Sequence, residues 1–264
     1  MRTVPADRSP QREDALAGLK YGLLLGCAVL ALVLPPAGHR QSAAAAISPP
    51  FPSSAVLTRA APEALQAPRL ADLRGKEASE AVRRVADWAT DSGDNQGLHF
   101  VVLDKRNAKV FLFRPDGTLR AATPVLLGSA PGDLTVDGVG GKPIHAVLPE
   151  ERTTPAGRFV AQPGRNTTPE DVVWVDYAAA VSMHRVRATD PRERRLERLA
   201  SPSVEDNRIS YGCINMPVAF FEQELWPVFQ AARGIVYVLP EVLPLQQVFA
   251  GLYDPVARHA ASLR

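Results

Sequence analysis

One cysteine, Cys213, is the residue best suited to do chemistry in this chain. It follows Gly212 in the segment Arg-Ile-Ser-Tyr-Gly-Cys-Ile-Asn at 208–215. A glycine before a nucleophile lets the backbone turn sharply, so the thiol can project and nearby amides can face an oxyanion. The alternative is a structural role, because a free cysteine often behaves as a small buried hydrophobe. From the context of this segment we predict a nucleophile.

A cysteine nucleophile needs a base, because a free thiol with a pKa of about 8.5 is only slightly ionised at neutral pH. Histidine is the usual partner, as base and later as acid to the leaving amine. The candidates are His99, His145, His184 and His259. His184 ends an apolar, strand-like run, where a rigid element can aim its side chain. We therefore predict that His184 is the base; a satisfied structural histidine is the alternative.

Composition narrows the classes of function. The chain has 264 residues, of which 46% are hydrophobic and 22% charged, enough for a packed core. Its 30 basic residues nearly balance 28 acidic ones, which gives no electrostatic basis for binding nucleic acid. Neither a His-Glu-x-x-His run nor paired cysteines occur in the sequence, so we predict no metal and no cofactor.

The N-terminal segment 1–46 has the pattern of an export signal or membrane anchor. Basic residues precede an apolar run at 21–34, which two prolines end. The run is shorter than the roughly 20 residues of a bilayer span and typical of a signal-peptide core. The remainder is therefore expected in the periplasm or cell envelope, either released by cleavage or tethered to the membrane. Cys27 falls in this segment, which leaves Cys213 without a disulfide partner in the folded part.

The rest of the chain divides into four parts by composition and hydrophobic period. A Pro/Ala-rich linker at 47–75 leads to a helical lead-in at 76–97, a catalytic domain at 98–240 and a C-terminal tail at 241–264. From these patterns the domain is expected to be mostly β, with a few peripheral helices.

The expected elements follow from the same patterns. We expect an antiparallel meander of strands at 100–103, 110–113 and 119–127, further strands at 172–182 and 235–239, and helices at 76–90, 190–199, 220–232 and 246–253.

An arginine-rich run at 192–198 has two interpretations. It is expected to form a solvated helix with exposed ion pairs, because Asp190 stands four positions before Arg194, and Glu197 three after it. Alternatively, its guanidinium groups could bind carboxylates of a substrate.

The Ser-Tyr-Gly-Cys-Ile-Asn run at 210–215, with His184 upstream, resembles the catalytic signature of the L,D-transpeptidases. A second run, Thr-Pro-Ala-Gly-Arg-Phe at 154–159, is similar to a strand of that family, and the likeness spans 98–240. The resemblance implies a β-sandwich enzyme that acts on peptidoglycan stem peptides. Cys213 would form a thioester with a tetrapeptide stem, release D-alanine and pass the acyl group to an amine.

The resemblance also implies roles for the residues around the nucleophile. His184 would activate the thiol and protonate the departing D-alanine, while the main-chain carbonyl of Arg185 orients its ring. The amides of Gly212 and Cys213 would stabilise the oxyanion. The expected positioning residues are Ser210 and Asn215.

Two features depart from the family pattern. Tyr211 stands where the family commonly has histidine, and we expect it either to contact substrate or simply to pack. His184 and Cys213 stand 29 positions apart, a longer spacer than is usual for the family. The additional residues, within 185–207, are expected to form an inserted lid or helix beside the cleft.

Other functions would use the same residues. If water opened the thioester, the chain would be an L,D-carboxypeptidase or an amidase. If the site were silent, the chain would be a non-catalytic module that binds the cell wall. Access of the acceptor amine decides between transfer and hydrolysis.

Overall fold

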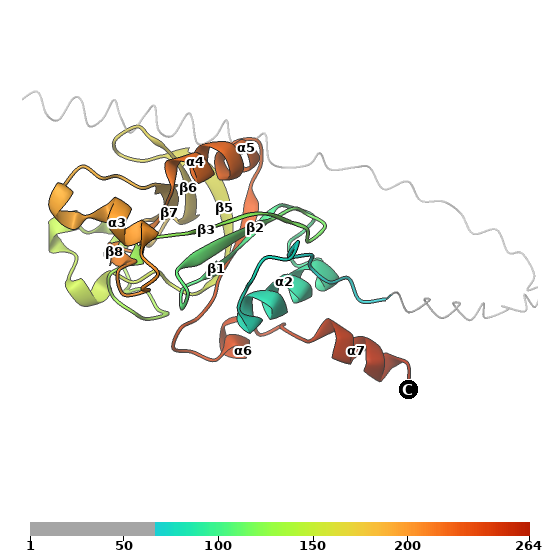
Figure 1. Ribbon diagram of the computed structural model, residues 1–264. Coiled ribbons are helices and arrows are strands. Elements are labelled where there is room, and N and C mark those ends of the chain that lie inside the picture. Colours follow the sequence, from blue (N-terminus) through green and yellow to red (C-terminus); the bar gives the residue numbers. More distant parts are fainter. Residues whose placement is uncertain (1–66) are drawn as a thin grey trace, which may run out of the picture. The chain divides into compact units, whose positions relative to one another are not determined.

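The computed structural model describes residues 67–264 (Figure 1). The predicted export segment at 1–46 and the linker up to residue 66 lie outside the described residues. The described part is mostly β with a few helices, as predicted. Between residues 67 and 264 there is no helix with the length and apolar character to cross a bilayer.

Ten strands form the described part of the fold. They are β1 (Phe100–Asp104), β2 (Lys109–Phe113), β3 (Leu119–Pro124), β4 (Leu127–Gly128), β5 (Gly157–Arg165), β6 (Asp171–Asp176), β7 (Val181–Arg185), β8 (Arg208–Ser210), β9 (Ile214–Met216) and β10 (Gly234–Val238). Eight of them make one mixed sheet in the order β3-β2-β1-β10-β5-β6-β7-β9, and β4 pairs with β8 in a small second sheet.

Eleven helical segments accompany the strands in the described part of the chain. They are α2 (Glu80–Ser92), the short 3-10 helices η1 (Val139–Gly141), η2 (Ile144–Ala146), η3 (Pro149–Glu151) and η4 (Pro191–Glu193), then α3 (Arg195–Ala200), α4 (Val218–Phe220), the π-helical turn η5 (Phe221–Leu225), α5 (Trp226–Phe229), α6 (Leu245–Val248) and α7 (Pro255–Ser262).

The predicted antiparallel meander is confirmed. β1 pairs with β2, and β2 with β3, antiparallel in both cases. The third strand is shorter than predicted because it ends at Pro124, and the chain enters the second sheet only at Leu127, as β4 beside β8. Proline has no amide hydrogen to donate to a ladder, which favours the end of a strand there.

β5 belongs to both halves of the large sheet. Residues 157–161 pair with β10, and residues 162–165 pair with β6. The inner faces of β1, β2 and β10 share one core cluster with those of β6, β7 and β9, in which Val101, Met183 and Val236 are fully buried. The predicted packing of sheet against sheet is thus made by one sheet that folds over itself across β5.

Helix α2 covers the opposite face of β1, β2 and β10. Its apolar stripe, which includes Val82, packs with Phe100 in a second buried cluster. The helix starts at Glu80, later than predicted, because Ser79 caps it by accepting a hydrogen bond from the Val82 amide. It ends at Gly93, whose φ of 71° is favourable for glycine.

The single strand predicted at 172–182 is wrong, because the segment forms a hairpin. β6 and β7 pair antiparallel around a turn at 177–180, in which Ala180 has a φ of 54°. The turn contains neither glycine nor proline, and its one local signal is Asp176, whose Oδ1 accepts from the Ala179 amide at 3.1 Å. The reversal brings β7, with His184, alongside β9.

The helices predicted after β7 are present with shifted ends. The segment 190–199 contains η4 and α3, and the segment 220–232 is covered by α4, η5 and α5. The tail helix predicted at 246–253 is wrong in extent, since α6 ends at Val248. Asp254 then caps a separate helix, α7, by accepting from two amides of its first turn.

Candidate active site

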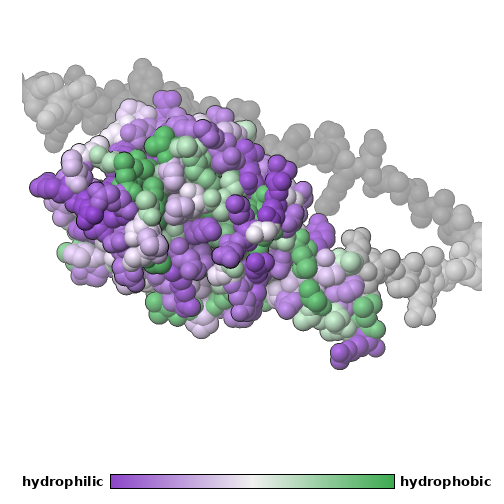
Figure 2. All heavy atoms as spheres, in the orientation of Figure 1, coloured by the Kyte–Doolittle hydropathy of each residue, from purple (hydrophilic) through white to green (hydrophobic). Residues whose placement is uncertain are grey.

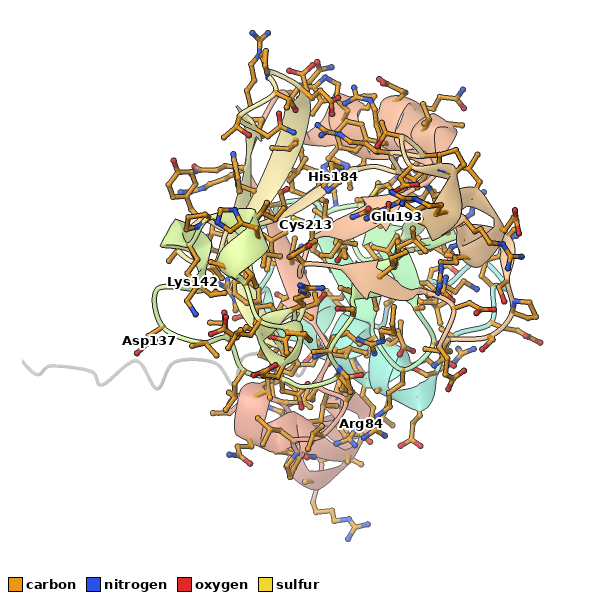
Figure 3. All side chains as sticks on the ribbon, turned by 90° about the vertical axis from the view of Figure 1, so that its left-hand side faces the viewer. Arg84, Asp137, Lys142, His184, Glu193 and Cys213 are labelled. Carbon is orange, nitrogen blue, oxygen red and sulfur yellow. The ribbon has the colours of Figure 1, made fainter. Side chains whose placement is uncertain are left out.

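A cleft of about 380 Å³ holds both residues predicted to do chemistry, Cys213 and His184. The rest of its lining comes from the segment 210–215, from the segment 187–195 and from Ile144. Figure 3 shows Cys213 and His184 close together on this face, with Glu193 beside them. The other three candidate histidines are not among the residues that line this cleft.

The register of two neighbouring strands brings these residues together. β7 and β9 are parallel, and His184 lies opposite Asn215. Cys213 directly precedes β9, so it stands near Ser182, at the start of β7. Both candidate residues are therefore positioned by the sheet.

The thiol of Cys213 is half-buried and has polar neighbours. Its Sγ lies 3.5 Å from the carbonyl oxygen of Ala180, to which it donates, and 3.7 Å from Oγ of Ser182. In the described part of the chain no hydrogen bond joins Sγ directly to His184. In this conformation the thiol hydrogen is directed at the Ala180 carbonyl.

The ring of His184 is held at both nitrogens. Its Nδ1 lies 2.8 Å from the carbonyl oxygen of Arg185, which can only accept, so Nδ1 carries the hydrogen. Its Nε2 accepts from the Asn215 amide at 3.3 Å. Burial lowers the pKa of His184 below its ordinary value of 6.5, and the Arg185 carbonyl, which acts in the opposite direction, does not compensate. The imidazole is thus neutral at neutral pH and has the form of a base.

Asn215 connects the histidine with the nucleophile segment. It is 1% exposed, and its Nδ2 also lies 3.3 Å from the carbonyl oxygen of Cys213. Its Oδ1 accepts from Arg195 Nη1 at 2.8 Å. The predicted positioning residue therefore contacts three other parts of the cleft.

The turn before Cys213 requires glycine at position 212. Gly212 has a φ of 126°, and a Cβ there would lie 2.7 Å from the carbonyl oxygen of Thr153. Ser210 closes the turn, because its Oγ accepts from the Gly212 amide at 3.1 Å and donates to the Cys213 carbonyl at 2.6 Å.

The two amides expected to stabilise the oxyanion differ in their hydrogen bonding. The Gly212 amide, predicted to face an oxyanion, is engaged with Ser210. The Cys213 amide has no acceptor within residues 67–264. Of the two predicted donors, Cys213 alone has its amide hydrogen free for a ligand in this conformation.

Thr154 supports the turn from behind, a contact that sequence reasoning missed. It is fully buried; its Oγ1 accepts from the Gly128 amide at 3.0 Å and donates to the Gly212 carbonyl at 2.8 Å. Its own carbonyl accepts from Lys105 Nζ at 2.9 Å. The signal was present, since Thr154 opens the second run that resembles the family, but its partners are distant in sequence.

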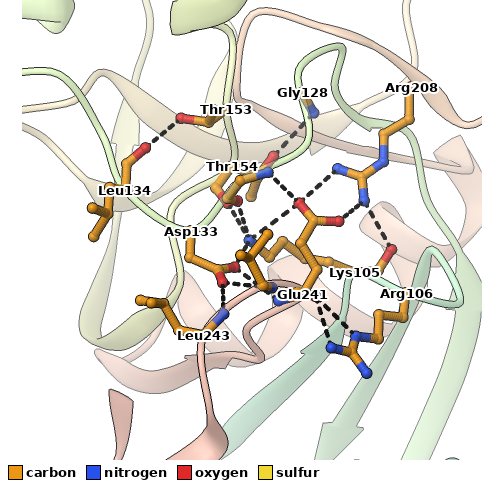
Figure 4. Close-up of polar contacts among 12 residues, drawn as sticks. Lys105, Arg106, Gly128, Asp133, Leu134, Thr153, Thr154, Arg208, Glu241 and Leu243 are labelled. Carbon is orange, nitrogen blue, oxygen red and sulfur yellow. Dashed lines mark hydrogen bonds and ion pairs between the residues drawn. The ribbon is translucent and has the colours of Figure 1, made fainter. Parts of the chain in front are cut away.

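A buried ionic cluster lies next to Thr154 (Figure 4). Lys105, with no exposed surface, donates to Asp133 Oδ1 at 2.7 Å, and Glu241 pairs with Arg208. Burial pushes the pKa of Asp133 up, but hydrogen bonds from Lys105 and from the amides of residues 241–243 outweigh it and hold that pKa at about 2. The cluster therefore ties the ends of β1, β8 and β10 to the base of the site.

Tyr211 forms part of the cleft wall. Its side chain is 39% exposed, and the Arg152 guanidinium lies 4.2 Å from the centre of its ring. Arg152 belongs to the long connection between β4 and β5, which also supplies Ile144 to the cleft. The same connection rests on the β6–β7 turn, because a Cβ at Gly140 would collide with the Ala178 carbonyl oxygen.

The segment 185–207 lies beside the cleft, as predicted from the sequence. Its hydrophilic side chains gather over η4 and α3 at the left of Figure 2. Arg194 pairs with Glu197 as predicted, whereas Asp190 pairs with Arg192 and not with Arg194. Arg195 points into the cleft instead of into solvent.

Neither a model of a known protein family nor a curated protein matches this chain. Among solved structures, the chain is similar to the helical cell shape determining protein Pgp2 from Campylobacter jejuni, with 11% identity, a TM-score of 0.39, and coverage of 70% of this chain and 62% of that one. It is also similar to the LD transpeptidase LdtMt1 in complex with imipenem, with 16% identity, a TM-score of 0.30, and coverage of 53% and 58%. The chain spans less than two thirds of either of these proteins.

Proposed function

We propose that the chain is a cysteine acyltransferase of the L,D-transpeptidase type that acts on tetrapeptide stems of peptidoglycan. The observation that carries the proposal is the shared cleft, in which neighbouring parallel strands place Cys213, neutral His184 and the linking Asn215 together. A reactive thiol, a base and a positioned amide are the minimum set for acyl transfer through a thioester.

In the first step, the thiol rotates into the cleft and gives its proton to Nε2 of His184. The sulfur then attacks the carbonyl carbon of the stem peptide, and the oxyanion accepts a hydrogen bond from the Cys213 amide. Collapse of this intermediate breaks the C–N bond, and the imidazolium returns the proton to the departing D-alanine amine. An oxyanion donor of this kind contributes about 3 kcal/mol to the lowering of the barrier.

In the second step, an acceptor amine attacks the thioester. His184 takes the proton that the amine loses, and the C–S bond breaks to release the thiol after that proton returns to sulfur. The lowered pKa of His184 suits both steps, because the imidazole must be unprotonated when each begins. Water in place of the amine would give the hydrolytic products of a carboxypeptidase.

Purified protein with tetrapeptide muropeptides tests the proposal. Mass spectrometry should find cross-linked dimers and free D-alanine, and Cys213→Ala should abolish both. If the only products are tripeptide monomers, the activity is hydrolysis and not transfer. A Cys213→Ala variant that still cross-links would contradict the mechanism, and a wild type that only binds wall fragments would make the chain a binding module.

A carbapenem tests the nucleophile separately. Its β-lactam ring should open on Cys213 and add its whole mass as an acyl thioester, which peptide mapping can locate. Cys27→Ser is the matched control, because it removes the other cysteine of the chain and should leave the adduct unchanged.

We also propose that the segment 1–46 directs the domain to the periplasm or cell envelope, by a cleaved signal or a retained anchor. A fusion of this segment to a reporter enzyme that is active only outside the cytoplasm should be active. A fusion that begins at residue 47 should be silent. Equal activity of the two fusions would contradict the proposal.

A further inference from the structure

Arg195 differs from its neighbours in the arginine-rich segment. Its side chain is 13% exposed, whereas those of Arg192 and Arg194 are 89% and 68% exposed. A long charged side chain is seldom buried without a partner. Here the partners are Glu193 and Asn215.

Glu193 fixes the direction in which the Arg195 guanidinium points. It accepts from Nε at 2.6 Å and from Nη2 at 3.3 Å, a two-point contact that suits the planar group. The remaining Nη1 donates to Asn215 Oδ1 at 2.8 Å. The insertion therefore presents one fixed donor to a buried amide of the site.

This donor selects one orientation of the Asn215 amide. With Oδ1 facing Arg195, Nδ2 faces two acceptors, Nε2 of His184 and the carbonyl of Cys213. In the flipped orientation, NH₂ would face a guanidinium and Oδ1 would face a carbonyl oxygen, which would leave buried donors and acceptors unmatched.

The orientation of Asn215 supports the form of His184 that the Arg185 carbonyl already favours. A donor at Nε2 and a carbonyl acceptor at Nδ1 are compatible only with the tautomer that carries its hydrogen on Nδ1. The Nε2 lone pair then faces the cleft side, where a long 3.3 Å contact can give way to the thiol.

We propose that Arg195 is a positioning residue of the transferase site, acting through Asn215 to hold the His184 ring in place with the lone pair of Nε2 ready for the thiol proton. The inference rests on the proposed function and adds to it a residue from the insertion. The insertion would thus be a working part of the site, beyond any role as a cover.

The charges around His184 give the proposal a pH signature. Burial keeps the imidazole neutral, Arg187 and Arg195 also oppose its protonation, and Glu170 favours it. Loss of the Arg195 charge should therefore make it easier to protonate His184. The acid limb of the pH profile, where Cys213 loses reactivity as pH falls, should then move to higher pH.

Two variants test the proposal in the full chain with Cys27→Ser. Arg195→Gln removes the charge and the planar guanidinium that contacts Glu193 at two points. Arg195→Lys keeps the charge with a different donor geometry. Arg194→Gln is the matched control, since Arg194 lies next to Arg195 and pairs only with exposed Glu197 in the described part of the chain. The first readout is the rate at which iodoacetamide alkylates Cys213 between pH 5 and pH 9 (about the range over which histidine and cysteine titrate).

In Arg195→Gln we expect the alkylation rate at neutral pH to fall about tenfold, the effect of losing one charge-assisted hydrogen bond. We also expect the acid limb to move to higher pH. Arg195→Lys should keep the acid limb and recover part of the rate, and it serves as the test variant if Arg195→Gln does not fold. On muropeptides, kcat should fall with little change in KM.

A second readout is the nitrogen NMR spectrum of His184. The wild type should show a protonated Nδ1, and in Arg195→Gln the Nε2 resonance should shift because its hydrogen bond from Asn215 is loosened. Unchanged alkylation and an unchanged imidazole spectrum in Arg195→Gln would overturn the inference, even if wild-type cross-linking is found. A shifted profile in a protein that cross-links nothing would instead overturn the proposed function, and Arg195 would then position His184 in a site with another activity.

Discussion

Gly212 shows how one residue type determines the geometry around the thiol. Its φ is positive, and only 2.7 Å would separate an added Cβ from the Thr153 carbonyl oxygen, so there is no room for a side chain. The prediction of a sharp turn at this glycine agrees with its positive φ and with the close approach of the Thr153 carbonyl. The partner of its amide, Ser210, depends on a turn that the sequence does not specify.

Gly212→Ala should therefore displace Cys213 and destabilise the fold by about 1–3 kcal/mol. Thermal unfolding measures the stability, and alkylation of Cys213 measures the displacement. Gly141→Ala is the control, because a Cβ there meets nothing within 4 Å. If the two variants have equal stability and equal alkylation rates, the strain assigned to a side chain at position 212 is contradicted.

His184 should give activity an acid limb below pH 6.5. Burial depresses its pKa in the folded state, so the imidazole stays an active base to lower pH than a free histidine. The same shift affects stability: as pH falls below 6.5, the unfolded state binds the proton first, so the free energy of unfolding decreases until the folded pKa is passed.

Chemical denaturation at a series of pH values measures this loss of stability. His184→Gln should flatten the slope below pH 6.5, and His145→Gln, at an exposed position of the chain, should retain it. A slope that survives His184→Gln would assign the titration to another group.

At the scale of elements, the segment that leads into β5 determines the position of the turn at residues 210–213. Thr154 precedes this strand and holds Gly128 and Gly212 through one hydroxyl. Removal of that hydroxyl leaves two buried backbone groups without partners, whereas the hydroxyl of neighbouring Thr153 contacts only the Leu134 carbonyl near the surface.

Thr154→Val should cost about 1–3 kcal/mol for each unsatisfied group and should slow acyl transfer. Thr153→Val should change both much less. Denaturant unfolding and muropeptide turnover measure the two effects. A Thr154→Val variant with wild-type turnover would show that the turn keeps its shape without this contact.

Elements with a clear period could be predicted from the sequence, and turns without glycine or proline could not. The meander β1–β3 and the helix α2 follow from short apolar runs and from a helical apolar stripe, although the stripe did not locate the Ser79 cap. The β6–β7 turn relies on Ala180 in a conformation that alanine seldom adopts, so tertiary packing specifies it. That hairpin determines the position of His184. The sequence therefore predicted the residue itself but not the residues that contact it.

At the scale of the whole molecule, the buried cluster around Lys105 and Asp133 was beyond prediction. Its members come from segments that are far apart in the chain. From the sequence alone, each of them would be predicted to be an ordinary charged residue on the surface. Only the closed sheet brings them together, beneath the site they support.

Lys105→Met should destabilise the domain by about 3–5 kcal/mol, because it leaves the Asp133 charge buried without its cation. The double variant Lys105→Met/Asp133→Leu should recover part of this loss. Denaturant unfolding of the two single variants and the double variant gives the coupling between them. Additive losses would mean that the pair does not interact.

Asp133 also predicts how the domain responds to acid. Its pKa falls from 3.8 to about 2 on folding, so its stabilising effect is complete above pH 3.8 and is lost as pH falls through about 2. Asp133→Asn should weaken that dependence, as measured by circular dichroism during acid titration. A titration curve unchanged from wild type would contradict the assigned pKa.

The place of β10 between β1 and β5 has a consequence for the order of assembly. Phe100 pairs with Ile235, near the opposite end of the domain, and Glu241 joins the ionic cluster just after that strand. A chain that emerges from a ribosome or a translocation pore, N-terminus first, can form the hairpins of β1–β3 early. It must then wait for its last strand before the sheet closes, so a premature stop anywhere before Gly234 should leave an inactive, protease-sensitive product.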